Sequence, residues 1–257
     1  MAGRALLAPN PAGAHFLRDR TLISLLASAS GARDGRLVFD LGAGAGAITA
    51  RLAATGARVI AVERDPRFAA RLRRRFDGEP RVRVVEADIR TVALPRRPFL
   101  VVASPPFALT TLLFRRLLGD PLVPLAGAEL IVQREAARSL ARSRPRGAET
   151  AWWAARYEIR LTQAVSAASF VPAPSVSAAW LSIRPRPALA QARGQGQFRT
   201  LLRTAYHRPG ARTGHALAGH HRLLVRAGIS PAVPVCEVTA DQWHQLAVQL
   251  AGAHGFR

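Results

Sequence analysis

A glycine-rich turn between an apolar run and a helical pattern narrows the folds open to this chain more than any other feature. The apolar run Arg36–Leu41 passes directly into a turn that contains Gly42, Gly44 and Gly46. Glycine adopts positive φ without steric cost and lets a ligand approach the backbone, and the helix that follows offers free N–H groups. We therefore expect a buried strand, a turn suited to a nucleotide-like cofactor, and a helix in this order.

The same order of strand and helix repeats through the first two-thirds of the chain. Strands are expected at 36–41, 58–62, 81–86, 99–103, 128–133, 157–165 and 176–183, and helices at 45–54, 66–76 and 109–118. This alternation is typical of an α/β protein with a parallel, doubly wound sheet. Short helical patterns follow at 197–206, 214–227 and 240–251. The sequence therefore predicts two domains, 1–184 and 185–257, the second of them small and helical.

Every basic residue of the chain is arginine. The chain has 37 arginines and no lysine against 16 acidic residues, and its formal charge of +21 predicts a polyanionic partner. No acidic residue occurs between Ile159 and Val235, whereas solvated faces usually mix both signs. Guanidinium groups grip phosphates through two hydrogen bonds. This interval therefore predicts a nucleic-acid footprint, with candidate contacts at Arg199, Arg203, Arg208 and Arg212.

Several other kinds of protein are disfavoured by what the sequence lacks. The single cysteine, Cys236, cannot form an internal disulfide, which suits a reducing cytosol. There is no run of about 18 apolar residues, and the amino terminus does not follow the pattern of a signal peptide. The late histidines have no cysteine or acidic residue among them, so we expect no metal at His207, His215, His220 and His221. We expect a cytoplasmic monomer, with Trp152 and Trp153 used for packing rather than for stacking on bases.

Three carboxylates follow or end the predicted strands. Gly42, Gly44 and Ala47 also satisfy the dinucleotide pattern G-x-G-x-x-G/A, so an NAD-dependent oxidoreductase remains an alternative. Asp40 argues against it, because a carboxylate repels a pyrophosphate but suits a cationic amino-acid group. Glu63 can accept both ribose hydroxyls of an adenosine, a role shared by binders of NAD and of S-adenosylmethionine. Asp88 is placed to accept from an adenine amino group.

The fourth predicted strand leads into Ser104-Pro105-Pro106-Phe107. This tetrapeptide resembles the (N/D/S)-P-P-(Y/F) signature of methyltransferases that act on exocyclic amino groups of nucleobases. The hydroxyl of Ser104 and the carbonyl of Pro105 can each accept one N6–H of adenine, which directs the nitrogen lone pair at a sulfonium methyl. Proline stiffens such a loop, and Phe107 can stack on an extruded base. The loop favours a methyltransferase over an oxidoreductase.

Taken with these sites, the chain resembles the Erm-type rRNA adenine N6-methyltransferases and their KsgA-type relatives along nearly its whole length. Ala14–Leu17 (AHFL) stands where that family has Q-N-F-L, and 40–46 matches its E/D-x-G-x-G-x-G loop. Ser104–Thr111 (SPPFALTT) matches N-(I/L)-P-Y-N-I-S-T. The segment 170–178 (FVPAPSVSA) resembles F-x-P-x-P-x-V-D-S-A, which is the most specific of these motifs. Ser104, Phe107, Ala108 and Ala14 replace the family's usual Asn, Tyr, Asn and Gln.

The resemblance implies a Rossmann-like S-adenosylmethionine-dependent methyltransferase fold with a small helical C-terminal domain that contacts rRNA. It implies that the cofactor S-adenosylmethionine is bound at His15, Leu17, Asp40, Gly42, Gly44, Glu63, Asp88 and Ser104. Ser104, Pro105 and Phe107 are the catalytic candidates. The favoured function is methylation of adenine N6 in 23S rRNA, with resistance to macrolide-type antibiotics.

Two alternatives to methylation of 23S rRNA stay open. One is the small-subunit dimethyltransferase of ribosome assembly, which Ser104 in place of Asn and the length of 257 residues disfavour. The other is a non-catalytic rRNA-binding assembly factor, which the same serine keeps open.

Overall fold

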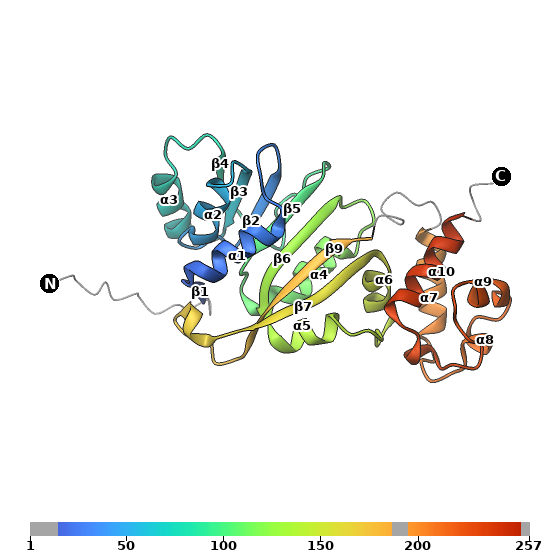
Figure 1. Cartoon of the computed structure of the whole chain (residues 1–257). Coiled ribbons are helices and arrows are strands. Elements are labelled where there is room, and N and C mark those ends of the chain that lie inside the picture. Colours follow the sequence, from blue (N-terminus) through green and yellow to red (C-terminus); the bar gives the residue numbers. More distant parts are fainter. Residues whose placement is uncertain (1–14, 187–194, 253–257) are drawn as a thin grey trace.

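The computed structural model describes residues 15–186 and 195–252. Figure 1 shows a sheet covered by helices, with a separate group of helices, α7 to α10, at the carboxyl-terminal end. Ala14 of the AHFL motif and Arg193 of the acid-free interval lie outside the described residues.

The sheet has seven strands in the order β4-β3-β2-β5-β6-β9-β7. Their bounds are β2 Leu37–Leu41, β3 Arg58–Glu63, β4 Val82–Glu86, β5 Phe99–Ala103, β6 Leu125–Gln133, β7 Tyr157–Val165 and β9 Ala178–Pro185. The first five in this order pair in parallel, whereas β9 runs antiparallel to both β6 and β7. All seven predicted strands are confirmed. The sheet is mixed rather than parallel throughout, because no helical crossover separates β7 from β9.

Helices cover both faces of the sheet, and alternate residues of each strand face opposite sides. Phe99, Val101 and Ala103 of β5 belong to one apolar cluster, and Leu100 and Val102 belong to another. The helices of this part are α1 Arg20–Ser30, α2 Ala47–Ala53, α3 Pro66–Arg75, α4 Thr110–Leu118, α5 Arg134–Leu140 and α6 Ala148–Arg156, with 3-10 turns η1 Phe107–Leu109 and η2 Ala167–Ser169. The three predicted helices are confirmed, and α1, α5 and α6 are additional.

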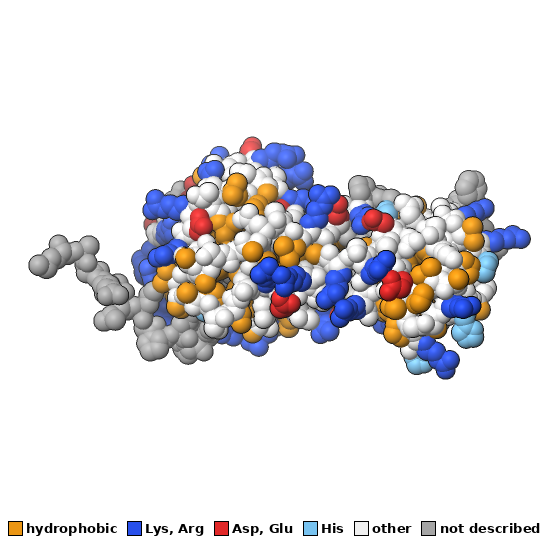
Figure 2. Space-filling view, turned by 60° about the horizontal axis from the view of Figure 1, so that its bottom comes forward, with side chains coloured by type: hydrophobic (Ala, Val, Ile, Leu, Met, Phe, Trp, Pro, Cys, Tyr) orange, Lys and Arg blue, Asp and Glu red, His pale blue; other side chains and the backbone are white. Residues whose placement is uncertain are grey.

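The carboxyl-terminal helices share a core with the sheet domain. They are α7 Gln195–Ala205, α8 Thr213–Ala216, α9 His221–Arg226, the 3-10 turn η4 Val235–Glu237 and α10 Ala240–Gly252. The helix predicted at 214–227 is instead two short helices, since the chain turns at Gly219 with a φ of +88°. Trp152 and Trp153 are each 3% exposed and lie in one cluster with Phe198 and Trp243. The prediction that this tryptophan pair is used for packing is confirmed. On the surface of the same end of the molecule, Figure 2 shows a group of histidines.

Two short strands join segments that are far apart in the sequence. β1 (Phe16–Leu17) pairs antiparallel with β8 (Phe170–Val171). The Arg18 N–H donates to the carbonyl of Ser169 at 2.8 Å, and His15 Nδ1 lies 2.9 Å from the carbonyl oxygen of Pro172. The family-like motif at 170–178 therefore lies against the start of the described chain.

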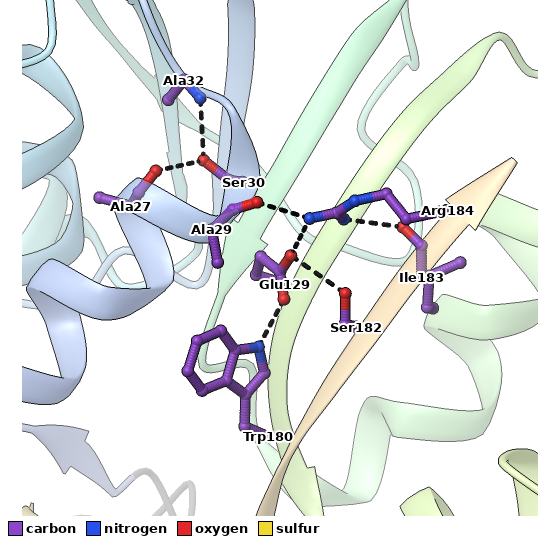
Figure 3. A network of polar contacts seen from close by, with 9 residues as sticks. All are labelled: Ala27, Ala29, Ser30, Ala32, Glu129, Trp180, Ser182, Ile183 and Arg184. Carbon is purple, nitrogen blue, oxygen red and sulfur yellow. Dashed lines mark hydrogen bonds and ion pairs between the residues drawn. The ribbon is translucent and has the colours of Figure 1, made fainter. Parts of the chain in front are cut away.

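A buried carboxylate fastens β9 and α1 to the middle of the sheet. Glu129 of β6 is 0% exposed. Its carboxylate accepts hydrogen bonds from Trp180 Nε1, from Ser182 Oγ at 3.1 Å and from Arg184 (Figure 3). Arg184 also donates to the carbonyl of Ala29 at the end of α1, at 2.6 Å. Since a buried charge is tolerated only where it is paired and hydrogen-bonded, these bonds fix the register of β9 on β6.

Candidate functional site

A cavity of about 250 Å³ lies at the carboxyl ends of the parallel strands. In an open α/β sheet this edge is the usual place for a ligand. Five of the residues predicted to bind a cofactor line it, namely His15, Gly42, Glu63, Asp88 and Ser104. They come from five separate segments, so the fold brings together what the sequence keeps apart.

The other predicted residues lie next to the cavity rather than on its wall. Leu17, the second residue of β1, is 7% exposed and packs in the apolar core. Asp40 is buried in β2, and Gly44 sits in the glycine turn with a φ of +53°. Pro105 is buried behind Gly42. Phe107 lies at the rim, with its ring centroid 5.9 Å from that of His15.

The carboxylate of Glu63 links the glycine turn to the start of α3 through two backbone hydrogen bonds. Its Oε2 accepts from the N–H of Gly44 at 2.9 Å, and its Oε1 accepts from the N–H of Asp65 at 2.8 Å. A carboxylate oxygen offers about two lone-pair sites, so each oxygen keeps acceptor capacity toward the cavity. The two backbone bonds hold the carboxylate in place for a diol or a similar pair of donors.

Asp40 is a buried carboxyl with an unsatisfied oxygen. Its Oδ2 accepts from Thr49 Oγ1 at 2.6 Å, but Oδ1 has no hydrogen-bond partner. Burial raises the pKa of Asp40 to about 7, against the opposing effect of the Thr49 hydrogen bond, and the neighbouring charge of Glu63 adds to the rise. An orphaned buried acceptor of this kind fits a site that gains a donor or a cation when it is filled.

Asp88 is held by two arginines that the sequence analysis did not single out. Arg90 Nε donates to its Oδ2 at 3.0 Å, and Arg64 Nη1 lies 3.6 Å from the same oxygen. The hydrogen bonds from Arg90 lower the pKa of Asp88 to about 2. Asp88 is therefore ionised and acts only as an acceptor at neutral pH.

Aromatic rings surround the Ser104 loop. Phe107 lies between His15, at 5.9 Å, and Phe170, at 6.3 Å between ring centroids. Phe16 packs on Phe68 at 4.9 Å, and both line the cavity. Flat rings beside a half-buried hydroxyl suit the faces and the polar edge of a nucleobase.

Nine further residues of the cavity wall were missed by the sequence analysis. They are Phe16, Arg64, Asp65, Phe68, Ile89, Arg90, Pro106, Ala108 and Leu109. Phe16, Pro106, Ala108 and Leu109 stand inside motifs that were recognised, so the motifs themselves were the available signal. Arg64, Asp65, Ile89 and Arg90 follow strand ends and Phe68 lies in α3, and the direction of these side chains depends on the fold.

The four candidate RNA-binding arginines are all exposed. Arg203 lines a surface groove of about 580 Å³ with Gly147, Ala148, Thr204, Tyr206 and His207. Tyr206 donates to the carbonyl of Pro145 at 2.9 Å, so this groove lies where the α5–α6 loop meets α7. Arg199 lies over the ring of Trp152, 5.9 Å from its centroid. Arginines are spread over the whole face shown in Figure 2, not only over the carboxyl-terminal helices.

Residues 15–186 and 195–252 contain no group of three or more His, Cys, Asp or Glu side chains arranged to hold a metal ion. Among the same residues no helix combines the length and the apolar character needed to cross a bilayer.

The parallel strands of the mixed sheet, the positive-φ glycine turn, the acidic residues at the ends of β3 and β4 and the Ser-Pro-Pro-Phe loop are together typical of a methyltransferase that uses a nucleoside-containing cofactor. Residues 10–251 match the model of the ribosomal RNA adenine dimethylase family. The chain belongs to this family, and it is an S-adenosylmethionine-dependent rRNA adenine N6-methyltransferase.

Relatives of two kinds are similar to the chain. It is 36% identical to the mycinamicin-resistance protein MyrB of Micromonospora griseorubida, over 91% of this chain and 76% of that protein. It is 34% identical to ribosomal RNA small subunit methyltransferase A of a Synechococcus species, over 76% of this chain and 73% of that protein. Among solved structures, 23S rRNA methyltransferase ErmE superposes with a TM-score of 0.78 at 26% identity, over 92% of this chain and 99% of that chain.

Proposed function

We propose that the chain methylates N6 of an adenine in 23S rRNA and thereby protects the large ribosomal subunit from macrolide-type antibiotics. The observation that carries this choice is the likeness to MyrB, which is named for mycinamicin resistance and matches 91% of the chain at 36% identity. The superposition on ErmE, named as a 23S rRNA methyltransferase, supports it over 92% of the chain.

The small-subunit rRNA is the second candidate substrate. Two Synechococcus relatives named as small subunit methyltransferase A are 34% and 33% identical to the chain. These values are close to that of MyrB, so the two substrates are separated by experiment rather than by identity.

The residues that line the cavity and those that lie next to it fit S-adenosylmethionine. The unsatisfied Oδ1 of Asp40 is a buried acceptor for a cationic amino-acid group, and Glu63 keeps lone pairs for ribose hydroxyls. Asp88 is an ionised acceptor suited to an adenine amino group. Gly42 and Gly44 allow close approach of the backbone, and His15 lines the amino-terminal side, where Leu17 packs in the core as the next residue but one. When bound, S-adenosylmethionine supplies an electrophilic methyl group on a positively charged sulfur.

The Ser104 loop positions the methyl acceptor. The adenine N6 lone pair is delocalised into the ring and is therefore a weak nucleophile. We assign the Ser104 hydroxyl and the Pro105 carbonyl as acceptors of the two N6–H groups, which directs the lone pair away from the loop and toward the cavity. Phe107 stacks on the base, and its neighbours His15 and Phe170 complete an apolar surround. The exposed side chains of Arg199, Arg203, Arg208 and Arg212 contact phosphates of the RNA.

Expression in a macrolide-sensitive bacterium that lacks its own resistance methyltransferase tests the proposal. Reverse transcription across 23S and 16S rRNA reports dimethylated adenines as stops, and nucleoside digestion gives the number of methyl groups. A new stop in 23S rRNA with raised macrolide tolerance is the expected result. Rescue of a host deficient in small-subunit dimethylation, with unmodified 23S rRNA, would instead favour the second candidate.

A further inference from the structure

Arg116 ties α4 to the turn at 88–92, which follows β4 and borders the cofactor cavity. It lies near the end of α4, and its terminal nitrogens donate separately, Nη1 to the carbonyl of Ile89 and Nη2 to the carbonyl of Val92. Since a guanidinium is a rigid planar fork, it fixes these two carbonyls relative to each other and to α4.

The turn held by Arg116 forms the Asp88 side of the cavity. Its own backbone hydrogen bonds run from Thr91 and Val92 to the carbonyl of Asp88. Asp88 and Ile89 both line the cavity, and Ile89 Cδ1 lies 3.4 Å from where a Cβ on Gly42 would stand. A shift of this turn therefore moves the wall beside Gly42 together with Asp88.

The amino-terminal end of α4 is joined to the Ser104 loop. The 3-10 turn η1 follows this loop and runs directly into α4. The N–H of Leu109 donates to the carbonyl of Pro106 at 2.9 Å, and both residues line the cavity. The guanidinium on α4 thus links the wall that contains Asp88 to the wall that contains Ser104.

Arg116 is not needed to hold α4 against the sheet. Leu113, Phe114, Leu117 and Leu118 of the same helix are each 2% exposed or less. Arg116 itself is half-buried, and loss of hydration lowers the pKa of its guanidinium, against the opposing charge of Asp88. Its donors therefore serve loop carbonyls rather than solvent.

We propose that Arg116 is a positioning residue for methyl transfer, which couples the loop that borders the cofactor to the loop that receives the target base. The inference rests on the proposed roles of Asp88 and Ser104. In the native chain, contact of the cofactor with the Asp88 turn sets the position of Ser104 through α4. In a chain without the guanidinium, the position of the Ser104 loop no longer depends on that of the Asp88 turn.

Arg116→Met and Arg116→Lys test the proposal, because Met removes the donors and Lys keeps the charge but not the fork. Titration calorimetry gives the affinity for S-adenosylmethionine, and single-turnover assays at saturating cofactor give the transfer rate on the rRNA that the wild-type chain modifies. We expect Arg116→Met to weaken binding and to slow transfer, each by about tenfold to a hundredfold, the scale for a misplaced reacting group. Arg116→Lys should fall between it and the wild type. Arg73→Met is the matched control, since Arg73 is an exposed arginine that bonds to Glu86 at the surface.

Asp88→Asn in both backgrounds separates coupling from general damage. With Arg116 present, Asp88→Asn should weaken cofactor binding and also slow transfer at saturating cofactor. With Arg116→Met, it should affect binding alone. An equal effect on the rate in both backgrounds, or a wild-type rate for Arg116→Met, would overturn the proposal, and Arg116→Lys supplies the same comparison if Arg116→Met does not fold. Cofactor binding is measured without RNA and so does not depend on the proposed function. A wild-type chain that binds S-adenosylmethionine but methylates neither 23S nor 16S rRNA would refute the proposed function. The predicted effect of Arg116→Met on cofactor affinity could still be measured in that case.

Discussion

Ser104 supplies the side-chain acceptor of its loop, since the next three residues are Pro105, Pro106 and Phe107. We expect Ser104→Ala to slow methyl transfer by about 10²–10³, the usual effect of removing one positioned hydrogen bond that acts in the transition state. Cofactor affinity should change little, because the bond is made to the reacting base. Single-turnover assays with nucleoside analysis measure the rate and the methyl count.

Two companion variants sharpen this prediction. Ser104→Asn restores the amide typical of the resembling family and should keep or raise the rate, with a shift of product toward dimethyladenosine. Ser139→Ala removes an exposed serine on α5 and should have no effect. A wild-type rate for Ser104→Ala would show that the Pro105 carbonyl and Phe107 suffice.

Asp40 makes stability depend on pH in an unusual direction for an aspartate. Its pKa is raised from 3.8 to about 7 by burial in the folded protein, so the folded chain keeps a proton that the unfolded chain releases above pH 4. The contribution of Asp40 to stability is therefore fully present below pH 4 and is lost as pH rises toward 7. The loss is roughly 4 kcal/mol at most, at about 1.4 kcal/mol for each pKa unit.

Chemical denaturation of the wild type and of Asp40→Asn between pH 5 and 8 measures this loss. The wild type should lose stability relative to Asp40→Asn as pH rises, and saturating S-adenosylmethionine should reduce the difference because its ammonium group favours the carboxylate. Parallel pH profiles for the two proteins would contradict the assignment.

At the scale of elements, the glycine turn and β1 constrain each other. A Cβ on Gly44 would stand 2.7 Å from two ring carbons of Phe16, and Gly44 has a φ of +53°. We expect Gly44→Ala to displace β1 and to weaken S-adenosylmethionine binding at least tenfold, or about 1.4 kcal/mol. Calorimetry measures the affinity.

Gly78→Ala is a matched control for this variant. Gly78 has a φ of +77° but nothing within 4 Å of the added carbon, so alanine there carries the left-handed backbone strain of about 1–2 kcal/mol without the clash. Removing the ring in Gly44→Ala/Phe16→Ala should recover part of the affinity. If Gly44→Ala and Gly78→Ala bind cofactor equally well, the contact with Phe16 does not matter for binding.

The strands were predictable because their apolar runs are short, β-branched and bounded by turn residues. The helices α1, α5 and α6 were not, because α1 mixes serine with leucine, α5 is short and charged, and α6 buries Arg156. The bonds of Glu129 to Trp180 and Arg184 depend on the register of β9 on β6, which no local pattern encodes.

Part of the candidate site could also be predicted from the sequence. Gly42, Glu63, Asp88 and Ser104 follow strand ends, so their placement at one edge comes from the topology. No recognised motif contains Arg64, Arg90 or Arg116. Their hydrogen-bond and ion-pair partners depend on the direction of a long side chain, which the sequence does not determine.

At the scale of the whole molecule, charge sets the affinity for RNA. Each phosphate contact contributes about 0.7–0.9 to the slope of log affinity against log salt. We expect replacement of Arg203, Arg208 and Arg212 by glutamine to lower this slope by about 2 to 3, with cofactor affinity unchanged. Filter binding of an rRNA fragment over a range of salt concentrations measures the slope.

A variant of equal charge loss distinguishes contact from net charge. Arg51, Arg58 and Arg83 are exposed on α2, β3 and β4, at the other end of the sheet. Their replacement by glutamine should leave the slope nearly unchanged. Equal slopes for the two triple variants would mean that the RNA does not lie on the carboxyl-terminal helices.

The pairing of β1 with β8 imposes an order on biosynthesis. A nascent chain emerges from the amino terminus, so the glycine turn, Glu63, Asp88 and Ser104 all leave the ribosome before the partner strand of Phe16 exists. Until Val171 has been made, the segment that carries His15 and Phe16 has nothing to pair with. The strand that carries Phe16 therefore gains its partner only after most of the chain has been translated, and a chain that ends at residue 160 contains every residue of the cavity wall without the strand that pairs with Phe16.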